Sequence, residues 1–441
     1  MTKQIRILTL LLAISSIFTA CKFEEPDLFE KSAAERLILA KERYYQALLS
    51  SPNGWVMDYF PTEDQKGYTF LVKFNENTSA VFAAKNELTN NAYATDTCVF
   101  EIIGDNGPVL TFNLAGDNLY KVGIFHIFTN PEGGYYGQGV GYGGDYEFMT
   151  ISATPEKIML KGKKRGVYIE LRRLPESQDW KDYFNQLDAM NNLLFNRYVS
   201  QILMSVEDSV YTLNNGISHI FVAVPQGGDP ITENSQIPFI VTDKGILFSK
   251  TVTYNNTAFR EFHLSDDKNE LICVDEGVNA KITGPDILNF YFSSTDAYNL
   301  RWVMSSGEEY MSPTVQAIYD RIVQAFLKID KNAPLNQIAF RNTQRDSNLI
   351  YIDNKKNQYG SLLFDREQLS EGVKYQYKNT FSSDRADNGK AFYTNLDGVA
   401  DLTVLASSSF KIEYASSKLN PIRVKLTDIS NPNVWFVLNV Q

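Results

Sequence analysis

The stretch Tyr68-Thr-Phe-Leu-Val-Lys-Phe74, followed by Asn75-Glu-Asn-Thr78 and Ser79-Ala-Val-Phe-Ala-Ala84, contains the pattern that decides the fold. Two short apolar runs, the first rich in aromatic side chains, flank a polar segment with two asparagines. Runs of this length and composition, separated by turn-forming residues, are typical of neighbouring antiparallel strands.

The same alternation with a period of two continues from Trp55 to Leu174. Short strands at this spacing, with Gly, Pro, Asn and Asp between them, predict an antiparallel sandwich or barrel. Because the strands follow one another in meander order, a lipocalin-like or avidin-like barrel is the first expectation. The nine predicted strands are Trp55–Phe60, Tyr68–Phe74, Ser79–Ala84, Thr97–Ile103, Val109–Leu114, Gly123–Phe128, Tyr146–Ala153, Lys157–Lys163 and Val167–Leu174.

Helical periodicity appears at three places. Ser32-Ala-Ala-Glu35 forms a capping box for a helix that ends before Pro52. A long amphipathic helix is predicted from Trp180 to Ile202, and a third helix begins at Ser312-Pro313. Further strands are predicted at Ser209–Leu213, His219–Val224, Pro238–Thr242, Gly245–Tyr254, Ala258–Leu264, Glu270–Asp275, Asn289–Ser293, Gln337–Arg341, Leu349–Ile352, Gly360–Phe364, Val373–Lys378, Ala400–Leu405, Phe410–Tyr414, Ile422–Thr427 and Val434–Val440.

The predicted fold class is therefore α+β, mostly antiparallel β, with a helix followed by a barrel-like or sandwich sheet about three times. This order predicts domains at 31–174, 175–306 and 307–441. An alternative division joins 175–441 into one larger domain. The three units share no residue-level match, so the repeat is one of architecture.

Residues 1–20 have the features of a secretory signal peptide of the lipoprotein type. Lys3 and Arg6 precede the mostly apolar run Ile7–Ile17, which is about 11 residues long. A helix needs ~20 residues to span a bilayer, so this run is too short to be a membrane anchor.

Cys21 directly follows Thr19-Ala20, an arrangement that resembles a bacterial lipobox, with Phe18 in place of the usual leucine. We expect cleavage before Cys21 and attachment of acyl chains, such as palmitate, to its thiol. The alternative is a secreted protein with an incidental cysteine. Residues 21–30 then form a tether. Its segment Lys22-Phe-Glu-Glu25 looks like the export signal of Bacteroidota surface lipoproteins, which predicts an outer-membrane protein facing the exterior. The alternative is an ordinary acidic tether.

The charge balance disfavours nucleic acid and anionic lipid surfaces as partners. The chain carries a net charge of −10, and loss of Lys3 and Arg6 with the signal leaves 40 basic and 52 acidic side chains, near −12. Besides Cys21, the cysteines are Cys98 and Cys273. Each lies within a strand-like run of a different unit, so we expect two separate buried thiols.

Three pieces of sequence resemble a known family. They are the segment Ser51-Pro-Asn-Gly-Trp-Val-Met-Asp-Tyr-Phe60, the strand at 67–74, and Gly144-Asp-Tyr-Glu-Phe148 together with Ile158-Met-Leu-Lys-Gly-Lys-Lys-Arg-Gly166. This combination resembles the uncharacterised Bacteroidota outer-membrane lipoproteins grouped as domain of unknown function 4302. The resemblance implies a lipoprotein often found with Sus-like nutrient-uptake systems, and it carries no catalytic residue, cofactor or metal ligand.

Catalytic motifs are not evident. His126, His219 and His263 have no metal-ligand spacing, and both His126 and His219 read as strand residues. Asp145 and Glu147 would share one face of a strand and form the best candidate carboxylate pair, but a solvated sheet edge also explains them. We predict no catalytic residue, no cofactor and no metal.

The glycine- and tyrosine-rich segment 131–146 is the best candidate for a binding loop. Its glycines permit many backbone shapes, while Tyr135, Tyr136 and Tyr142 offer flat rings with a polar tip, which suit sugars and peptides. The alternative is a hairpin, or a tyrosine-packed loop folded on the barrel.

These patterns favour a non-enzymatic surface lipoprotein that binds a glycan or peptide nutrient or serves a Sus-like transporter. A hydrolase of extracellular glycans or peptides is one rival, and a structural or adhesive surface protein is another. A concave patch with exposed tyrosines would favour binding. Two facing buried carboxylates would favour hydrolysis, and a flat surface would favour a structural role.

Overall fold

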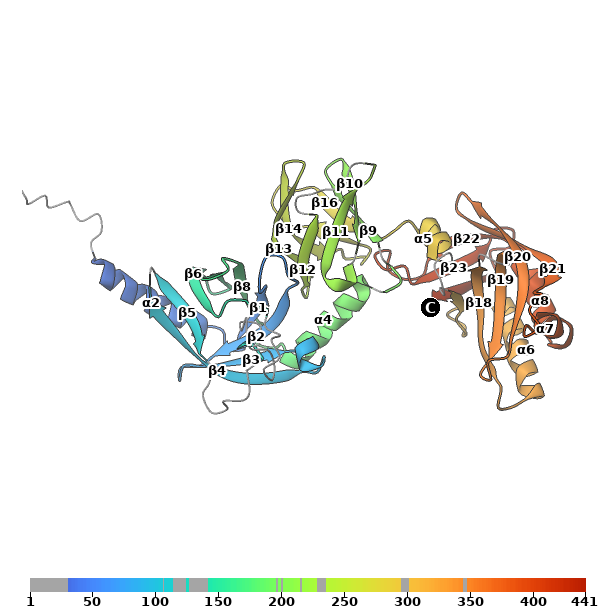
Figure 1. Cartoon of the computed structure of the whole chain (residues 1–441), viewed down its shortest axis with the longest axis horizontal. Helices are drawn as coiled ribbons and strands as arrows, with labels where there is room; N and C mark the ends of the chain where they lie inside the picture. Colours follow the sequence, from blue (N-terminus) through green and yellow to red (C-terminus); the bar gives the residue numbers. More distant parts are fainter. Residues whose placement is uncertain are drawn as a thin grey trace, which may run out of the picture.

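The computed structural model describes residues 31–105, 107–113, 124–126, 142–195, 197–199, 201–214, 216–227, 235–294, 301–343 and 347–441. The β-structure forms three closed antiparallel barrels of eight strands each, β1–β8, β9–β16 and β17–β24. They follow one another along the long axis of the molecule (Figure 1). The predicted fold class is confirmed, and the closure of each sheet selects the barrel over the sandwich.

The first barrel follows helix α2 (Ala33–Leu49), whose N-terminus carries the predicted capping box of Ser32 and Glu35. Its strands pair in meander order, and β1 closes the sheet by pairing with β8. The strands are β1 (Trp55–Tyr59), β2 (Tyr68–Phe74), β3 (Ser79–Ala84), β4 (Ala94–Gly104), β5 (Pro108–Asn113), β6 (Glu147–Ala153), β7 (Lys157–Gly162) and β8 (Tyr168–Arg173), with the 3-10 helix η1 (Glu87–Thr89) between β3 and β4.

The second barrel follows helix α4 (Trp180–Leu194). Its first strand, β9, pairs with both β10 and β16 and so closes the sheet. The strands are β9 (Gln201–Val206), β10 (Ser209–Asn214), β11 (Ile220–Pro225), β12 (Gln236–Val241), β13 (Gly245–Tyr254), β14 (Thr257–Leu264), β15 (Glu270–Cys273) and β16 (Ala280–Thr283), with the 3-10 helix η3 (Gly216–Ser218) before β11.

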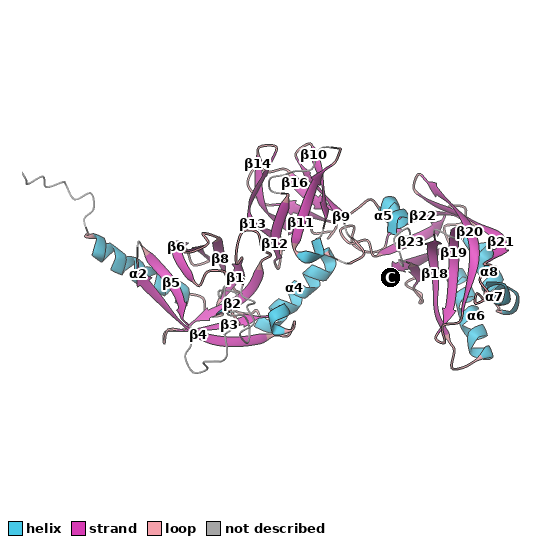
Figure 2. Ribbon diagram, in the orientation of Figure 1, coloured by secondary structure: helices cyan, strands magenta, loops and turns pink. Residues whose placement is uncertain are grey.

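The third barrel follows the short helix α5 (Ile287–Ser294) and carries three more helices between its strands, which Figure 2 shows in cyan. Its first strand, β17, begins at Trp302, before the predicted domain boundary at 306/307. The elements are β17 (Trp302–Met304), α6 (Pro313–Ile329), β18 (Leu335–Thr343), β19 (Ser347–Asn354), β20 (Tyr359–Leu369), β21 (Gly372–Phe381), α7 (Gly389–Asn395), α8 (Val399–Ala406), β22 (Ser409–Tyr414), β23 (Arg423–Asp428) and β24 (Trp435–Val440).

Strand β1 shows how the first barrel packs on both of its faces. All five of its residues are buried, although a strand with one wet face would alternate. Trp55, Met57 and Tyr59 point into the barrel core, where Tyr44 and Leu48 of α2 join them. The outward-facing Val56 instead packs against α4.

Helix α4 joins the first two barrels. Tyr183 and Phe184, in its N-terminal half, pack on the outer face of the first barrel. Leu194, at its C-terminal end, belongs to the core of the second barrel. One amphipathic helix therefore covers one barrel and enters the next, as Figure 1 shows for the green helix.

The second and third barrels also meet. The loop between β22 and β23 places Leu419, which is 1% exposed, in the core of the second barrel. Ser417 Oγ donates to the carbonyl of Lys268 at 2.5 Å, and Asn420 Nδ2 donates to the carbonyl of Asn192 at 3.1 Å. Gly284 lies so close to this loop that a Cβ there would be 1.6 Å from the Lys418 carbonyl oxygen.

Three predicted strands are wrong, and one predicted helix is too long. Asn289–Ser293 and Ala400–Leu405 are helical, within α5 and α8, because short buried apolar runs have no period that separates the two structures. The helix from Trp180 ends at Leu194 and not at Ile202, which lies in β9. Of the predicted strand Gly123–Phe128, the described residues 124–126 are not in a strand.

The two thiols outside the N-terminal segment are free and buried, as predicted. Cys98 lies in the core of the first barrel and Cys273 in that of the second. Burial, with help from Asp96, raises the pKa of Cys98 to about 12, and burial raises that of Cys273 to about 11. No described helix is both long enough and apolar enough to cross a membrane.

Candidate functional site

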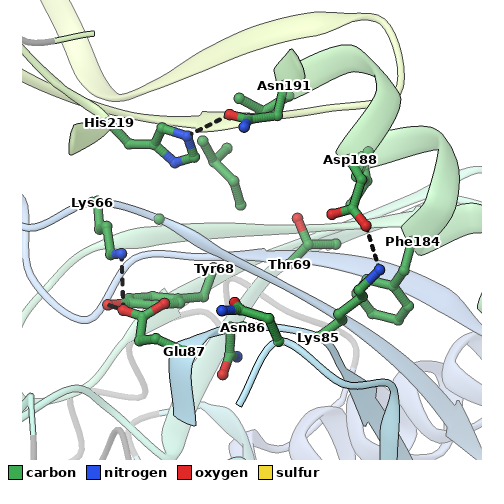
Figure 3. Close-up of a pocket in the computed structure, with 15 residues that line it drawn as sticks. Lys66, Tyr68, Thr69, Lys85, Asn86, Glu87, Phe184, Asp188, Asn191 and His219 are labelled. Carbon is green, nitrogen blue, oxygen red and sulfur yellow. Dashed lines mark hydrogen bonds and ion pairs between the residues drawn. The ribbon is translucent and has the colours of Figure 1, made fainter. Parts of the chain in front are cut away.

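A pocket of about 190 Å³ lies where the first barrel, helix α4 and the second barrel meet (Figure 3). Its floor comes from β2, from the end of β3 and from η1 of the first barrel. Its roof comes from α4, from β12 and from the turn before β11. Clefts between domains are common ligand sites, so we take this pocket as the candidate functional site.

Gly67 makes this close approach of the two barrels possible. It lies just before β2, and its backbone N–H donates to the Phe239 carbonyl of β12 at 3.2 Å. A Cβ at this position would lie 2.6 Å from the Phe60 ring and 2.8 Å from Cβ of Ile240. Phe60 and Ile240 form an apolar contact between the barrels, so a side chain at residue 67 would force them apart.

An ion pair and a tyrosine occupy one side of the floor. Lys66 Nζ lies 2.8 Å from Glu87 Oε1 and 5.2 Å from the centre of the Tyr68 ring. The Tyr68 hydroxyl donates to the same carboxylate at 2.9 Å. Burial opposes ionisation of Glu87, but the hydrogen bonds from Lys66, its own backbone and Tyr68 outweigh it, and its pKa is lowered. Burial and then Glu87 raise the pKa of Tyr68, which remains a donor.

Asn86 lies between the two ion pairs of the pocket in Figure 3. Its Oδ1 accepts from the backbone N–H of Leu88 at 3.0 Å and so caps η1. Its Nδ2 is buried and has no hydrogen-bond partner within the described part of the protein. A buried amide group without a partner is unfavourable, so a ligand atom that reached this N–H₂ would gain a hydrogen bond.

Helix α4 and the turn before β11 supply the roof. Asp188 of α4 reaches down to Lys85 and forms the second ion pair. His219 Nε2 lies 2.8 Å from Asn191 Oδ1 of the same helix. Burial, reinforced by Lys66, lowers the pKa of His219 to about 4, so its ring is neutral at physiological pH.

The tautomer of His219 follows from its partner. An amide oxygen can only accept, so the Nε2 atom carries the proton and Nδ1 keeps a lone pair. Figure 3 shows this second ring nitrogen turned toward the floor of the pocket. His219 has a φ of +58° and precedes β11, so its predicted strand position is wrong.

A second ionic cluster beside the pocket joins the same two barrels. Arg172 of β8 donates from Nε to Asp58 Oδ2 at 3.0 Å and from Nη1 to Asp243 Oδ1 at 3.1 Å. Tyr183 of α4 donates to Asp243 at 3.1 Å. The Asp58 side chain is only 1% exposed, so its pair with Arg172 is buried, whereas the Asp243 side chain is 29% exposed.

The predicted site residues are only partly covered by the structure. Cys21, Tyr135 and Tyr136 lie outside the described residues, as do residues 1–30. Tyr142 is half-buried, and its ring centre lies 5.7 Å from that of Tyr68. One of the three predicted tyrosines therefore packs against a residue that lines the pocket.

Sequence patterns did not single out Lys66, Asn86, Glu87 or Asp188, and they gave His219 a purely structural position. These residues come from separate elements, and only the packing of α4 and the second barrel over the first brings them together. The one local signal is the polar turn Lys85-Asn-Glu87 after a buried strand.

The other candidate chemistry has structural explanations. The Asp145 carboxylate accepts from the backbone N–H groups of Lys164 and Arg165, and Glu147 lies 3.5 Å from Lys163. In the pocket, Glu87 and Asp188 each pair with a lysine rather than facing one another. Among the described residues, no group of His, Cys, Asp and Glu is arranged to hold a metal ion.

The chain belongs to the family "Domain of unknown function (DUF4302)", which matches residues 25–266. This range contains more than half of the chain and all residues of the pocket. The resemblance to domain of unknown function 4302 is thus confirmed over these residues, whereas its Bacteroidota and outer-membrane lipoprotein parts stay predictions. No curated protein matches the chain.

Among solved structures, the chain is similar to the beta subunit from DNA polymerase of Streptococcus pyogenes, with 10% identity over 91% of this chain and 97% of that chain and a TM-score of 0.15. The DNA polymerase sliding clamp from Caulobacter crescentus shows 8% identity, the same two coverages and a TM-score of 0.14. The Helicobacter pylori beta clamp bound to DNA ligase peptide shows 9% identity over 90% and 95%, with a TM-score of 0.12. TM-scores this low do not establish a shared fold.

Proposed function

We propose that this protein is a lipid-anchored lipoprotein of the outer membrane, facing the cell exterior, that captures a nutrient in the pocket between its first two barrels. The nutrient is a glycan or a peptide fragment, passed on to a Sus-like transporter. The observation that carries the proposal is the pocket itself: a concave site with paired ions, an unpartnered buried donor and apolar side chains in its lining.

Two further observations support the cellular setting. The sequence Thr19-Ala20-Cys21 has the form of a lipidation site, and Lys22-Phe-Glu-Glu25 has that of a surface-export signal. Each acyl CH₂ buried in the bilayer contributes ~0.8 kcal/mol, so two or three chains on Cys21 would hold the protein at the membrane.

A variant that fills the pocket tests the proposal. Leu187 of α4 lines the pocket and is half-buried. Leu187→Trp should abolish binding on an array of glycans and peptides to which the parent protein binds. The matched control is Ile38→Trp on α2, where the residue is 66% exposed and does not line the pocket. Ligand binding that survives Leu187→Trp would place the site elsewhere and reject the pocket.

A further inference from the structure

The charges that line the pocket cancel within it. Lys66 pairs with Glu87, and Lys85 pairs with Asp188. His219 adds no charge at neutral pH. These two pairs leave no unpaired charge for an ionic ligand, which would gain an ion pair only by replacing a partner within one of them. The pocket is therefore suited to a neutral ligand.

The pocket lining contains both hydrogen-bond donors and hydrogen-bond acceptors. Asn86 Nδ2 is a buried donor without a partner. His219 Nδ1 is an acceptor, because Nε2 carries the proton that Asn191 accepts. The lysine ammonium groups and the carboxylates have further donors and acceptors beyond the single contact within each pair. Hydroxyl groups match such a lining, since each one donates and accepts at once.

Part of the pocket lining is apolar. It includes Phe184 and Leu187 of α4 and Ile240 of β12. A sugar ring has this same combination, with C–H groups on its faces and hydroxyl groups around its edge. Apolar lining with a few placed polar groups is the general pattern of small-molecule sites.

The size of the pocket limits how much ligand it can hold. Its volume of about 190 Å³ lies below the ~300–1,000 Å³ of sites that enclose a drug-sized ligand. It therefore suits a small group, such as one ring. The rim is open, with 43% of the Glu87 side chain and 52% of the Asp188 side chain exposed, so the rest of a longer chain can extend into solvent. A peptide would bring charged termini or need a groove along its backbone.

We infer that the pocket binds one neutral, hydroxylated ring at the end of a saccharide chain. The inference rests on the proposed function and narrows its ligand from "glycan or peptide" to an uncharged sugar.

Asn86→Asp tests the inference with little disturbance of the fold. The substitution keeps the Oδ1 atom that caps η1, but it replaces the donor Nδ2 by an oxygen and adds a negative charge. The matched control is Asn77→Asp in the β2–β3 turn, where the exposed Asn77 Oδ1 accepts from the Ser79 N–H at 3.2 Å. Urea denaturation of both variants checks that each remains folded.

Binding is measured by calorimetry with the full chain and a panel of defined probes. The panel contains neutral trisaccharides of glucose, galactose, mannose and N-acetylglucosamine, together with trigalacturonate, a glucosamine trimer and capped and uncapped tri-alanine. We expect at least one neutral trisaccharide to bind. Asn86→Asp should weaken its binding about 10-fold, while Asn77→Asp should not change it.

Three results separate the outcomes. Tighter binding of a uronate, an amine or a peptide, still sensitive to Asn86→Asp, overturns the neutral-sugar inference and leaves the proposed pocket function standing. Binding of a neutral trisaccharide that is insensitive to Asn86→Asp and to Leu187→Trp overturns both. Absence of binding to every probe also overturns both the neutral-sugar inference and the proposed function of the pocket.

Discussion

Replacing Arg172 by methionine should destabilise the joint between the first two barrels, because it leaves a buried carboxylate without its partner. Arg172 contacts two carboxylates of different solvent exposure: the Asp58 side chain is 1% exposed and that of Asp243 is 29% exposed. An ion pair with a solvated partner contributes about 0–1 kcal/mol. Removing one partner of a buried pair costs about 3–5 kcal/mol. We therefore expect Arg172→Met to lower the free energy of unfolding by an amount in this range at pH 8.

The loss should depend on pH in a defined direction. Burial raises the pKa of Asp58 even though Arg172 lowers it, and without the guanidinium the pKa rises further. A carboxyl whose folded-state pKa lies above its unfolded value binds more protons in the folded state, so stability increases as the pH falls through the folded-state pKa. The destabilisation by Arg172→Met should therefore be largest at pH 8 and smaller at pH 5.

Urea denaturation, followed by tryptophan fluorescence, measures this loss. The matched control is Lys157→Met, because Lys157 is the cross-strand neighbour of Arg172 and is 48% exposed in its ion pair with Glu170. It should cost no more than about 1 kcal/mol. Asp58→Leu added to Arg172→Met removes the stranded charge and should restore most of the stability. A loss below 1 kcal/mol at pH 8, or one that is equal at both pH values, would refute this reasoning.

Three other changes have expected outcomes. Cys21→Ser should release the protein from the membrane fraction, and persistent membrane attachment would reject the lipid anchor. His219→Asn suits the positive φ at this position. It also removes a ring whose pKa is lowered to about 4, so the free energy of unfolding of the parent decreases as the pH is lowered from 6.5 to 4. Urea denaturation at pH 7 and pH 4.5 gives the difference in free energy of unfolding between the parent and His219→Asn. This difference should shift against the parent by about 1–3 kcal/mol at the lower pH, and a constant difference would contradict a buried, neutral His219 ring. Leu419→Ala should cost about 2–5 kcal/mol and separate the unfolding of the third barrel from that of the second, whereas an unchanged single transition would show that this loop does not couple them.

Local sequence determined most of the strands because a strand with one buried face alternates along the chain. Strands β2 and β3 begin and end at the predicted residues, and several others differ by one to three. The capping box at Ser32 and Glu35 is likewise a local hydrogen-bond pattern, and the structure forms it. These features depend on neighbours within a few positions, which the sequence displays directly.

Errors arose where two periodicities or two structures fit the same residues. Ile202 continues the helical spacing of Leu194 and Tyr198, yet it also begins the alternation Ile202, Met204, Val206 that faces the second barrel core. The aromatic run of α5 resembles a strand, but Asp286 Oδ1 accepts from the Asn289 N–H at 2.9 Å and caps a helix. The rings of Phe290 and Tyr291 then pack on Trp302.

By itself, the sequence determined that the chain consists of antiparallel sheets, each preceded by a helix. It also showed a cysteine in a lipobox-like segment ahead of them and a resemblance to domain of unknown function 4302 that the comparison confirmed. Only the tertiary structure decided that the sheets close into barrels and that a pocket forms between two of them. Closure depends on the pairing of strands distant in sequence, such as β1 with β8. The pocket depends on Lys66, Asn86, Asp188 and His219 meeting across two barrels and a helix. No local pattern encodes such a meeting, because it results from packing around Gly67 and not from the spacing of the residues that meet.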